Sequence, residues 1–242
     1  AVMPDMPDRK KRMVEEIVII TMGENGRTDT FKGGAGELGH IRSCYFNDDI
    51  YPDLVISNPD ENKIIVMLNL GQGTLGEKKI IGTGTAPKGL DIKDINDDGF
   101  AEIITANSGS NTIGIIKSSN SQDTAYEEKR NTAYKTGNNP DMVATGDFNG
   151  DKITDIVSLR NGGDCIYMLW GLGRGDFYDG TCGIAGEGPL SLCKGDFNND
   201  GITDIVTANS LSQDLSILFG TGDGTFYGFP VRTREYPSCV IT

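Results

Sequence analysis

The stretch Asp147-Phe-Asn-Gly-Asp-Lys-Ile-Thr-Asp155 runs directly into Ile156-Val-Ser-Leu159, a short apolar segment rich in β-branched residues. Acidic and amide side chains occupy positions 1, 3, 5 and 9 of the first part, so their oxygens can converge across a tight loop. The apolar segment has the length and composition of a buried strand. An oxygen-rich loop followed at once by a strand is the unit from which the rest of the sequence is built.

This unit recurs in phase along the chain. Two further intact copies begin at Asp94 and Asp196, and an eroded copy has Tyr45 in place of the first aspartate. The starting positions 45, 94, 147 and 196 lie about 50 residues apart. Each copy continues through a polar turn, a second apolar run and a glycine-rich turn ending in an aromatic residue, as in Gly220-Thr-Gly-Asp-Gly-Thr-Phe226. About four strands per repeat of roughly 40–50 residues is the spacing of a β-propeller blade.

We therefore predict an all-β fold, a β-propeller of four-stranded blades over residues 17–242, preceded by an N-terminal arm at 1–16. The polar stretch from Asp123 to Lys135 is predicted to be a long surface loop. The expected number is about five blades, four of them whole.

The two ends of the chain leave the fifth blade open to two interpretations. Residues 17–31 read as the second half of a blade. The last residues, Tyr236-Pro-Ser-Cys-Val-Ile-Thr242, match the strand that precedes a loop, as in Pro140-Asp-Met-Val-Ala-Thr145. Either the two ends share one blade, which would remove exposed sheet edges, or the chain is a piece of a longer protein whose remaining blades are absent.

The oxygen-rich loop, the Asp204-Ile-Val-Thr-Ala-Asn209 strand and the glycine-rich turn resemble the FG-GAP/VCBS repeats of integrin-α-type propellers. The resemblance covers nearly the whole chain from about Ile17 onward. It implies blades of four antiparallel strands around an axis, with a calcium ion in each intact loop. It also implies adhesion or ligand recognition outside the cell, as in the lectins and integrin-like receptors of that family.

The loop chemistry is suited to calcium, which takes roughly six to eight hard oxygen ligands. Positions 1, 3 and 5 supply side chains, position 7 a main-chain carbonyl and position 9 a closing acid, whereas an EF-hand closes with an acid at position 12 between helices. Three sites are predicted, with a fourth, weaker candidate in the eroded copy. The predicted ligands are Asp94, Asn96, Asp98, Phe100 (carbonyl) and Glu102; Asp147, Asn149, Asp151, Ile153 (carbonyl) and Asp155; Asp196, Asn198, Asp200, Ile202 (carbonyl) and Asp204; and, in the eroded copy, Asn47, Asp49 and Asp53.

The bulk charge narrows the classes of partner. The net charge is −13 and the sequence pI is about 4.5. Such a surface repels nucleic acid and anionic membranes, so neither is expected to bind. No apolar run approaches the roughly 18 residues that a transmembrane helix needs, so membrane insertion is not expected. The acids gathered in the loops match a protein whose counter-ions are bound cations.

Five cysteines bear on the compartment: Cys44, Cys165, Cys182, Cys193 and Cys239. Their spacing is not that of a metal site, and one or two disulfides with a thiol left over are reasonable for a secreted protein. Cys165 with Cys182, or Cys182 with Cys193, are the local pairs, and the spacing does not choose between them. Extracellular calcium modules bind at roughly 10⁻⁴–10⁻³ M. We therefore expect a secreted or cell-surface protein.

The predicted function is a non-enzymatic adhesion or recognition module that binds a protein or a glycan through residues that the sequence does not identify. One alternative is a structural repeat unit of a larger extracellular assembly, completed by other subunits or missing blades. Another is a polysaccharide-acting enzyme such as a lyase. No catalytic residue is assigned, because His40 is the only histidine and no Gly-x-Ser-x-Gly motif is present. Arg174-Gly-Asp176 is interpreted as turn chemistry, and Trp170 is expected to pack between blades.

Overall fold

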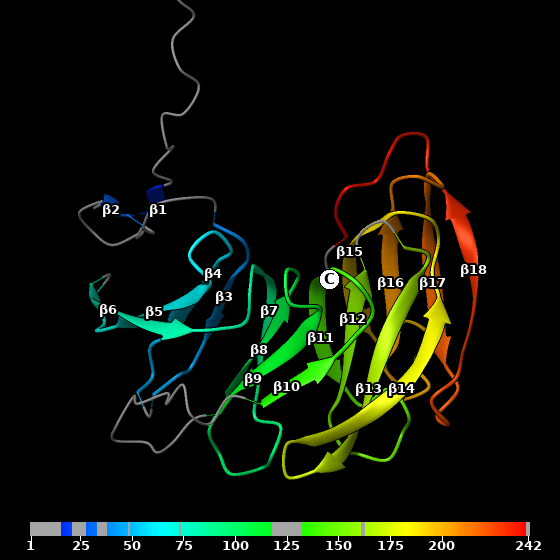
Figure 1. Cartoon of the computed structure of the whole chain (residues 1–242), viewed down its shortest axis with the longest axis horizontal. Coiled ribbons are helices and arrows are strands. Elements are labelled where there is room, and N and C mark those ends of the chain that lie inside the picture. The colour runs from blue at the N-terminus through cyan, green and yellow to red at the C-terminus, as the bar shows by residue number, and fades with distance from the viewer. Residues whose placement is uncertain are drawn as a thin grey trace, which may run out of the picture.

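The computed structural model describes residues 16–20, 28–32, 38–47, 49–72, 74–117, 132–160 and 163–240. Within these ranges the chain forms four antiparallel sheets of four strands each, together with a two-stranded hairpin (Figure 1). Every described element is a strand. The predicted all-β fold with four whole blades is confirmed.

Each sheet is a meander whose strands pair in chain order, and the four are called the first to fourth sheets. The bounds of the strands follow from the hairpin onward. The hairpin is β1 (Glu16–Ile20) and β2 (Thr28–Lys32); the first sheet is β3 (Ile41–Cys44), β4 (Asp53–Asn58), β5 (Lys63–Asn69) and β6 (Leu75–Gly82); the second is β7 (Pro87–Lys93), β8 (Glu102–Asn107), β9 (Thr112–Ile116) and β10 (Thr132–Lys135); the third is β11 (Pro140–Gly146), β12 (Asp155–Arg160), β13 (Cys165–Gly173) and β14 (Asp176–Ile184); the fourth is β15 (Pro189–Gly195), β16 (Asp204–Asn209), β17 (Asp214–Gly220) and β18 (Phe226–Arg232).

The sheets follow one another like the blades of a fan, and each one's first strand meets the next sheet's first strand. Strand β7 contacts β3 on one side and β11 on the other, and β11 in turn contacts β15. The approach is close at Gly89, where an added Cβ would lie 2.6 Å from the carbonyl oxygen of Asp141 and 2.7 Å from the Cα of Met142. A side chain at this position would force β7 and β11 apart. The first strand of each sheet, which meets the first strand of the next, is called its inner strand.

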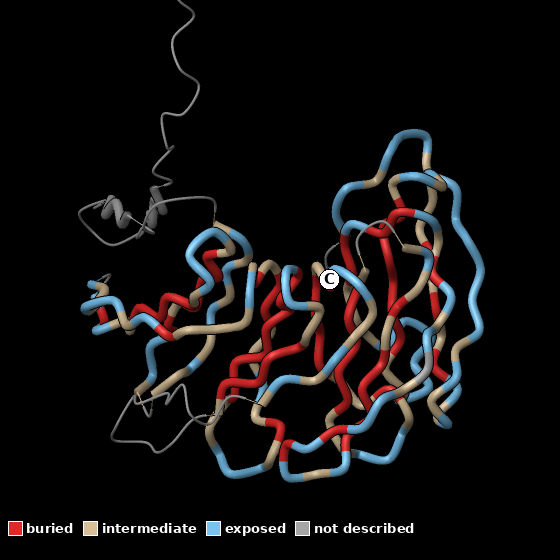
Figure 2. Tube along the Cα trace, in the orientation of Figure 1, coloured by how far each residue is buried: buried red, intermediate tan, exposed pale blue. Residues whose placement is uncertain are grey.

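The core lies between successive sheets, so each second strand is buried on both faces (Figure 2). Ile156 of β12 packs with Ile104 of the second sheet, and its neighbour Val157 packs with Ile205 of the fourth. Because successive strand residues point to opposite faces, a continuous β-branched run is what such a strand requires. Trp170 joins the core between the third and fourth sheets, as predicted.

The loop predicted at 123–135 was partly wrong. Thr132–Lys135 forms β10, which pairs with β9. Its alternating pattern turns Tyr134 toward Phe177 of the third sheet, with the two ring centroids 5.6 Å apart in an edge-to-face arrangement. Residues 118–131, and residues 1–15 of the predicted arm, lie outside the described residues.

The hairpin β1–β2 forms a separate two-stranded sheet. Residues 236–240 carry no strand assignment, so within the described ranges the two ends do not combine into a shared fifth blade. In the same ranges, no helix has the length and apolar character needed to cross a membrane.

Candidate functional site

The structure brings the predicted ligands at positions 1, 3 and 5 together in one tight turn. In the loop between β11 and β12, Asp147 accepts backbone N–H groups from Gly150 (2.7 Å) and Lys152 (2.9 Å). The Nδ2 group of Asn149 donates to Oδ2 of Asp151 at 3.0 Å. Gly150 and Lys152 have φ of 77° and 68°, and this left-handed backbone wraps the loop around the Asp147 carboxylate.

The same turn recurs in the other intact loops. Asn198 donates to Asp200 at 2.8 Å, and Asp196 accepts the backbone N–H groups of Asp200 (3.0 Å) and Gly201 (2.9 Å). In the loop between β7 and β8, Asp94 likewise accepts the N–H of Gly99 at 2.9 Å. All these loops connect the first and second strands of a meander. They therefore lie at the same end of the strands in successive sheets.

The closing acid at position 9 has a structural role that the sequence did not reveal. Asp155 is fully buried, and its Oδ2 accepts the N–H of Phe148 at 2.9 Å. Its Oδ1 accepts the N–H of Gly171 on β13 at 2.8 Å. One carboxylate therefore ties the loop to the third strand of its own sheet. Asp204 makes the equivalent pair of bonds, to Phe197 (2.8 Å) and Gly220 (2.9 Å).

The eroded loop between β3 and β4 keeps this structural bond pair without the first acid. Asp53 accepts N–H groups from Phe46 (2.9 Å) and Asn69 (2.7 Å) although Tyr45 stands at position 1. Asn47 still donates to Asp49, at 2.8 Å. The closing acid is thus retained in the loop that lacks the first acid, as a structural role predicts.

The closing acid of the second-sheet loop also accepts a hydrogen bond from a side chain of its own loop. Glu102 accepts the N–H of Ile95 at 3.1 Å through Oε2, and its Oε1 accepts the side-chain amide of Asn96 at 3.2 Å. The same amide nitrogen donates to Oδ2 of Asp98 at 3.0 Å. Two carboxylates therefore converge on one electropositive group. The longer glutamate side chain allows its carboxylate to reach the Asn96 amide.

Burial and like charges oppose ionisation of the closing acid. Burial raises the pKa of Asp155 to about 6, and the nearby Asp151 and Asp147 carboxylates raise it further, while the bonds from Gly171 and Phe148 act in the opposite direction. Burial likewise raises the pKa of Asp53. A cation placed among these carboxylates would favour their ionised forms.

The donor set of each intact loop fits a hard divalent cation. In the described ranges no three acidic, histidine or cysteine side chains come close enough to hold an ion by themselves. The predicted set also includes an amide and a main-chain carbonyl, and rotating the Asn96 amide about its Cβ–Cγ axis would turn Oδ1 toward the Asp98 and Glu102 carboxylates. Carboxylate, amide and carbonyl oxygens are the ligands that calcium takes.

The third-sheet loop is packed against the glycine-rich turn of the fourth sheet. Phe148, at position 2 of the third-sheet loop, faces Phe226 at the end of the fourth-sheet turn, with ring centroids 6.4 Å apart. An added Cβ at Gly150 would lie 3.3 Å from the carbonyl oxygen of Gly222. The aromatic residue that ends the turn motif is therefore an inter-sheet contact to the preceding loop.

The second and third sheets repeat this arrangement. Ile95, at position 2 of the second-sheet loop, shares a core with Phe177. The turn before Phe177 is Gly173-Arg-Gly175-Asp, in which Gly173, Arg174 and Gly175 all have positive φ. The interpretation of Arg174-Gly-Asp176 as a turn is confirmed.

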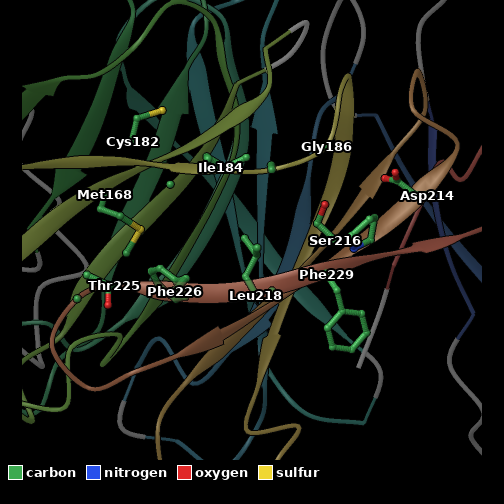
Figure 3. Close-up of a pocket in the computed structure, with 15 residues that line it drawn as sticks. Met168, Cys182, Ile184, Gly186, Asp214, Ser216, Leu218, Thr225, Phe226 and Phe229 are labelled. Atoms are coloured by element: carbon green, nitrogen blue, oxygen red, sulfur yellow. The ribbon is translucent and has the colours of Figure 1, made fainter.

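A groove of about 590 Å³ lies between the outer strands of the third and fourth sheets (Figure 3). Met168, Leu218 and Phe226 supply apolar side chains, whereas Phe229 alternates to the other side of β18. One end is polar, because Asp214 accepts hydrogen bonds from Asn209 and from Ser212. The groove can therefore hold a ligand with an apolar face and a hydroxyl or amide group.

Comparisons with known proteins agree with the repeat. Residues 46–105, 94–158 and 147–207 match the FG-GAP-like repeat, and residues 188–229 match the FG-GAP repeat. No curated protein sequence matches the chain.

Solved structures with low sequence identity share the fold. A protein from Lactobacillus plantarum has a TM-score of 0.69 at 13% identity, with 94% of this chain and 68% of that chain covered. A Bacteroides fragilis protein, provisionally described as a 6-phosphogluconolactonase, has a TM-score of 0.65 at 12% identity, covering 93% and 66%. The V. cholerae biofilm matrix protein Bap1 has a TM-score of 0.50 at 18% identity, covering 95% and 38%. The chain thus spans at most about two thirds of the length of these proteins.

Proposed function

The chain belongs to the FG-GAP repeat family, and from this premise we propose that it is a calcium-binding, non-enzymatic recognition module that works outside the cell. The observation that carries the proposal is the convergence of loop oxygens at one edge of successive sheets. In the second-sheet loop this convergence includes the closing acid, because the Asp98 and Glu102 carboxylates both accept hydrogen bonds from the Asn96 amide.

We propose that calcium shapes the binding surface by stabilising the interface between successive sheets. An ion held by Asp147, Asn149 and Asp151 would fix the backbone on either side of Phe148. That ring in turn packs against Phe226 of the next sheet. Calcium would therefore stabilise the contact between sheets, and with it the shape of the groove that lies between them.

The groove favours a glycan or a protein segment as the ligand. Its apolar side chains can pack against a sugar ring or an apolar side chain, and the polar end at Asp214 can accept a hydroxyl or amide proton. Bap1, which shares the fold, is described as a biofilm matrix protein, and this is consistent with recognition of an extracellular component.

A binding screen tests this function. The protein is applied to immobilised glycans and extracellular-matrix proteins at 2 mM calcium and in excess chelator, and soluble products are assayed in parallel. We expect calcium-dependent binding, weakened at least about tenfold by Ile184→Asp, at an exposed residue that lines the groove, without release of products. Leu211→Asp, at an exposed side chain outside the groove, is the control. Ligand cleavage, or binding indifferent to calcium, would contradict the proposal.

A second candidate is a structural unit of a larger assembly. The face of the fourth sheet that points away from the third carries exposed aromatic side chains, with Tyr227 57% and Phe229 52% exposed. Phe219 lies beside both rings. If this face is an assembly surface, sedimentation should show self-association that Phe229→Ser abolishes, whereas a monomer at all concentrations would leave recognition as the better account.

A further inference from the structure

The segment after β18 returns to the innermost strand of the fourth sheet. Val240 donates its N–H to Oγ of Ser191 on β15 at 3.1 Å, and that hydroxyl donates to the Val240 carbonyl oxygen at 3.3 Å. The Sγ of Cys239 lies 3.9 Å from the same hydroxyl. Residues 236–240, here called the tail, are thus held against β15 at a defined point.

Cys193 lies on the same side of β15 as the residue that holds the tail. Ser191 pairs with Ala208 and Cys193 with Val206, and residues two apart on a strand point to one face. The Cys193 side chain is therefore the next one along this face of β15 from Ser191, whose hydroxyl contacts Cys239. Burial raises the pKa of Cys193, and the neighbouring Cys239 thiol raises it further, which is consistent with their proximity.

The other cysteines are accounted for elsewhere. Cys165 and Cys182 form a disulfide between β13 and β14, which settles the pairing that the sequence left open. Cys44 is at the end of β3, where it packs with the core between the first and second sheets. Burial, followed by the nearby Asp53, raises its pKa to about 12, so it stays protonated near neutral pH. Cys193 and Cys239 are the remaining thiols, and the fold places Cys239 against the face of β15 that carries Cys193.

We propose that Cys193 and Cys239 form a second disulfide, which fastens the tail to the innermost strand of the fourth sheet. The oxidant is a small-molecule disulfide of the glutathione type. The thiolate of the exposed Cys239 attacks one of its sulfurs and releases one small thiolate. The thiolate of Cys193 then attacks the Cys239 sulfur of this mixed disulfide and releases the second. The protein thiols lose two electrons and two protons, and one small disulfide becomes two small thiols.

The bond would hold the tail where a following sheet begins. Pro237-Ser-Cys239 matches Pro140-Asp-Met142 in sequence, and Met142 lies beside Gly89 on the preceding inner strand. Cys239 bears the same relation to Ser191 as Met142 bears to Gly89. The disulfide would therefore hold the tail beside β15, in the way that β15 lies beside β11 and β11 beside β7.

Tryptic mapping of the intact chain tests this pairing. Cleavage after Arg160, Arg174, Lys194 and Arg234 puts Cys165 in peptide 161–174, both Cys182 and Cys193 in 175–194, and Cys239 in 235–242. The protein is equilibrated with oxidised and reduced glutathione, alkylated under denaturing conditions and digested without reduction. We expect the three peptides to stay joined in one species that reduction separates, with Cys44 as the alkylated cysteine.

Three variants make the result specific. In Cys165→Ser with Cys182→Ser, peptide 175–194 should remain joined to 235–242, because Cys193 alone can then link them. In Cys193→Ser, peptide 235–242 should be released in alkylated form, whereas Cys44→Ser should leave the joined species unchanged. Alkylated 235–242 from the oxidised native protein, or a link from Cys239 to Cys44, would overturn the proposal.

Discussion

Asp155→Ala is expected to lower the melting temperature of the calcium-free protein by about 4–24 °C. The substitution leaves the buried N–H groups of Phe148 and Gly171 without their carboxylate acceptor. Each buried donor left unpaired costs about 1–3 kcal/mol. For a chain of this length about 1 kcal/mol corresponds to roughly 2–4 °C. Scanning calorimetry or thermal circular dichroism in chelator measures the shift.

A matched pair of variants separates this structural role from metal binding. Asp151→Ala removes an exposed loop acid of the same site and should change the melting temperature in chelator by less than about 3 °C. Asp155→Asn retains one acceptor oxygen and should fall between the two. Equal destabilisation by Asp151→Ala and Asp155→Ala without calcium would show that the closing acid has no special structural part.

Phe148→Ala is expected to destabilise the protein by about 3–5 kcal/mol. The ring is fully buried between the third-sheet loop and Phe226 of the fourth sheet, so its removal leaves a cavity in the inter-sheet core. Urea unfolding followed by far-ultraviolet circular dichroism measures the loss, provided that the transition stays two-state.

The sequence offers its own control at the equivalent position of the next repeat. Phe197 follows Asp196 as Phe148 follows Asp147, but 42% of Phe197 is exposed. Phe197→Ala should therefore cost less than about 1.5 kcal/mol. Similar losses for the two variants would mean that contact with the following sheet does not determine the stability of the loop.

The fold was predictable from the sequence because each repeat carries the same local signals. The loop acids, the β-branched run after each loop and the glycine-rich turns mark one meander per repeat, and four such meanders are present. The strand β10 was not predicted because Thr132-Ala-Tyr-Lys135 is short and polar. Its packing depends on the contact between Tyr134 and Phe177. That contact joins residues far apart in the sequence.

The candidate site was predictable in composition but not in the use of each residue. The spacing places Asp147, Asn149 and Asp151 in one turn whatever the rest of the protein does. The two backbone bonds of Asp155 depend on where β13 lies, and the sequence does not state this. A clue was nevertheless present, since the eroded repeat keeps Asp53 after losing the first acid to Tyr45.

The pairing of Cys165 with Cys182 is another feature that needed the fold. Its two cysteines are brought together by the register of β13 and β14, in which Cys165 pairs with Ile184 and Tyr167 with Cys182. Sequence separation alone allowed Cys182 to pair with Cys193 instead. Strand register is set by packing over the whole sheet, and no single local motif reports it.

Isothermal titration of the chelator-treated protein with calcium measures the proposed binding sites themselves. We expect about three sites per chain with dissociation constants of roughly 10⁻⁴–10⁻³ M. Asp147→Ala and Asp196→Ala should each remove one site, while the exposed Asp60→Ala, outside the loops, should remove none. No heat of binding at millimolar calcium, or an unchanged stoichiometry in both loop variants, would contradict this expectation.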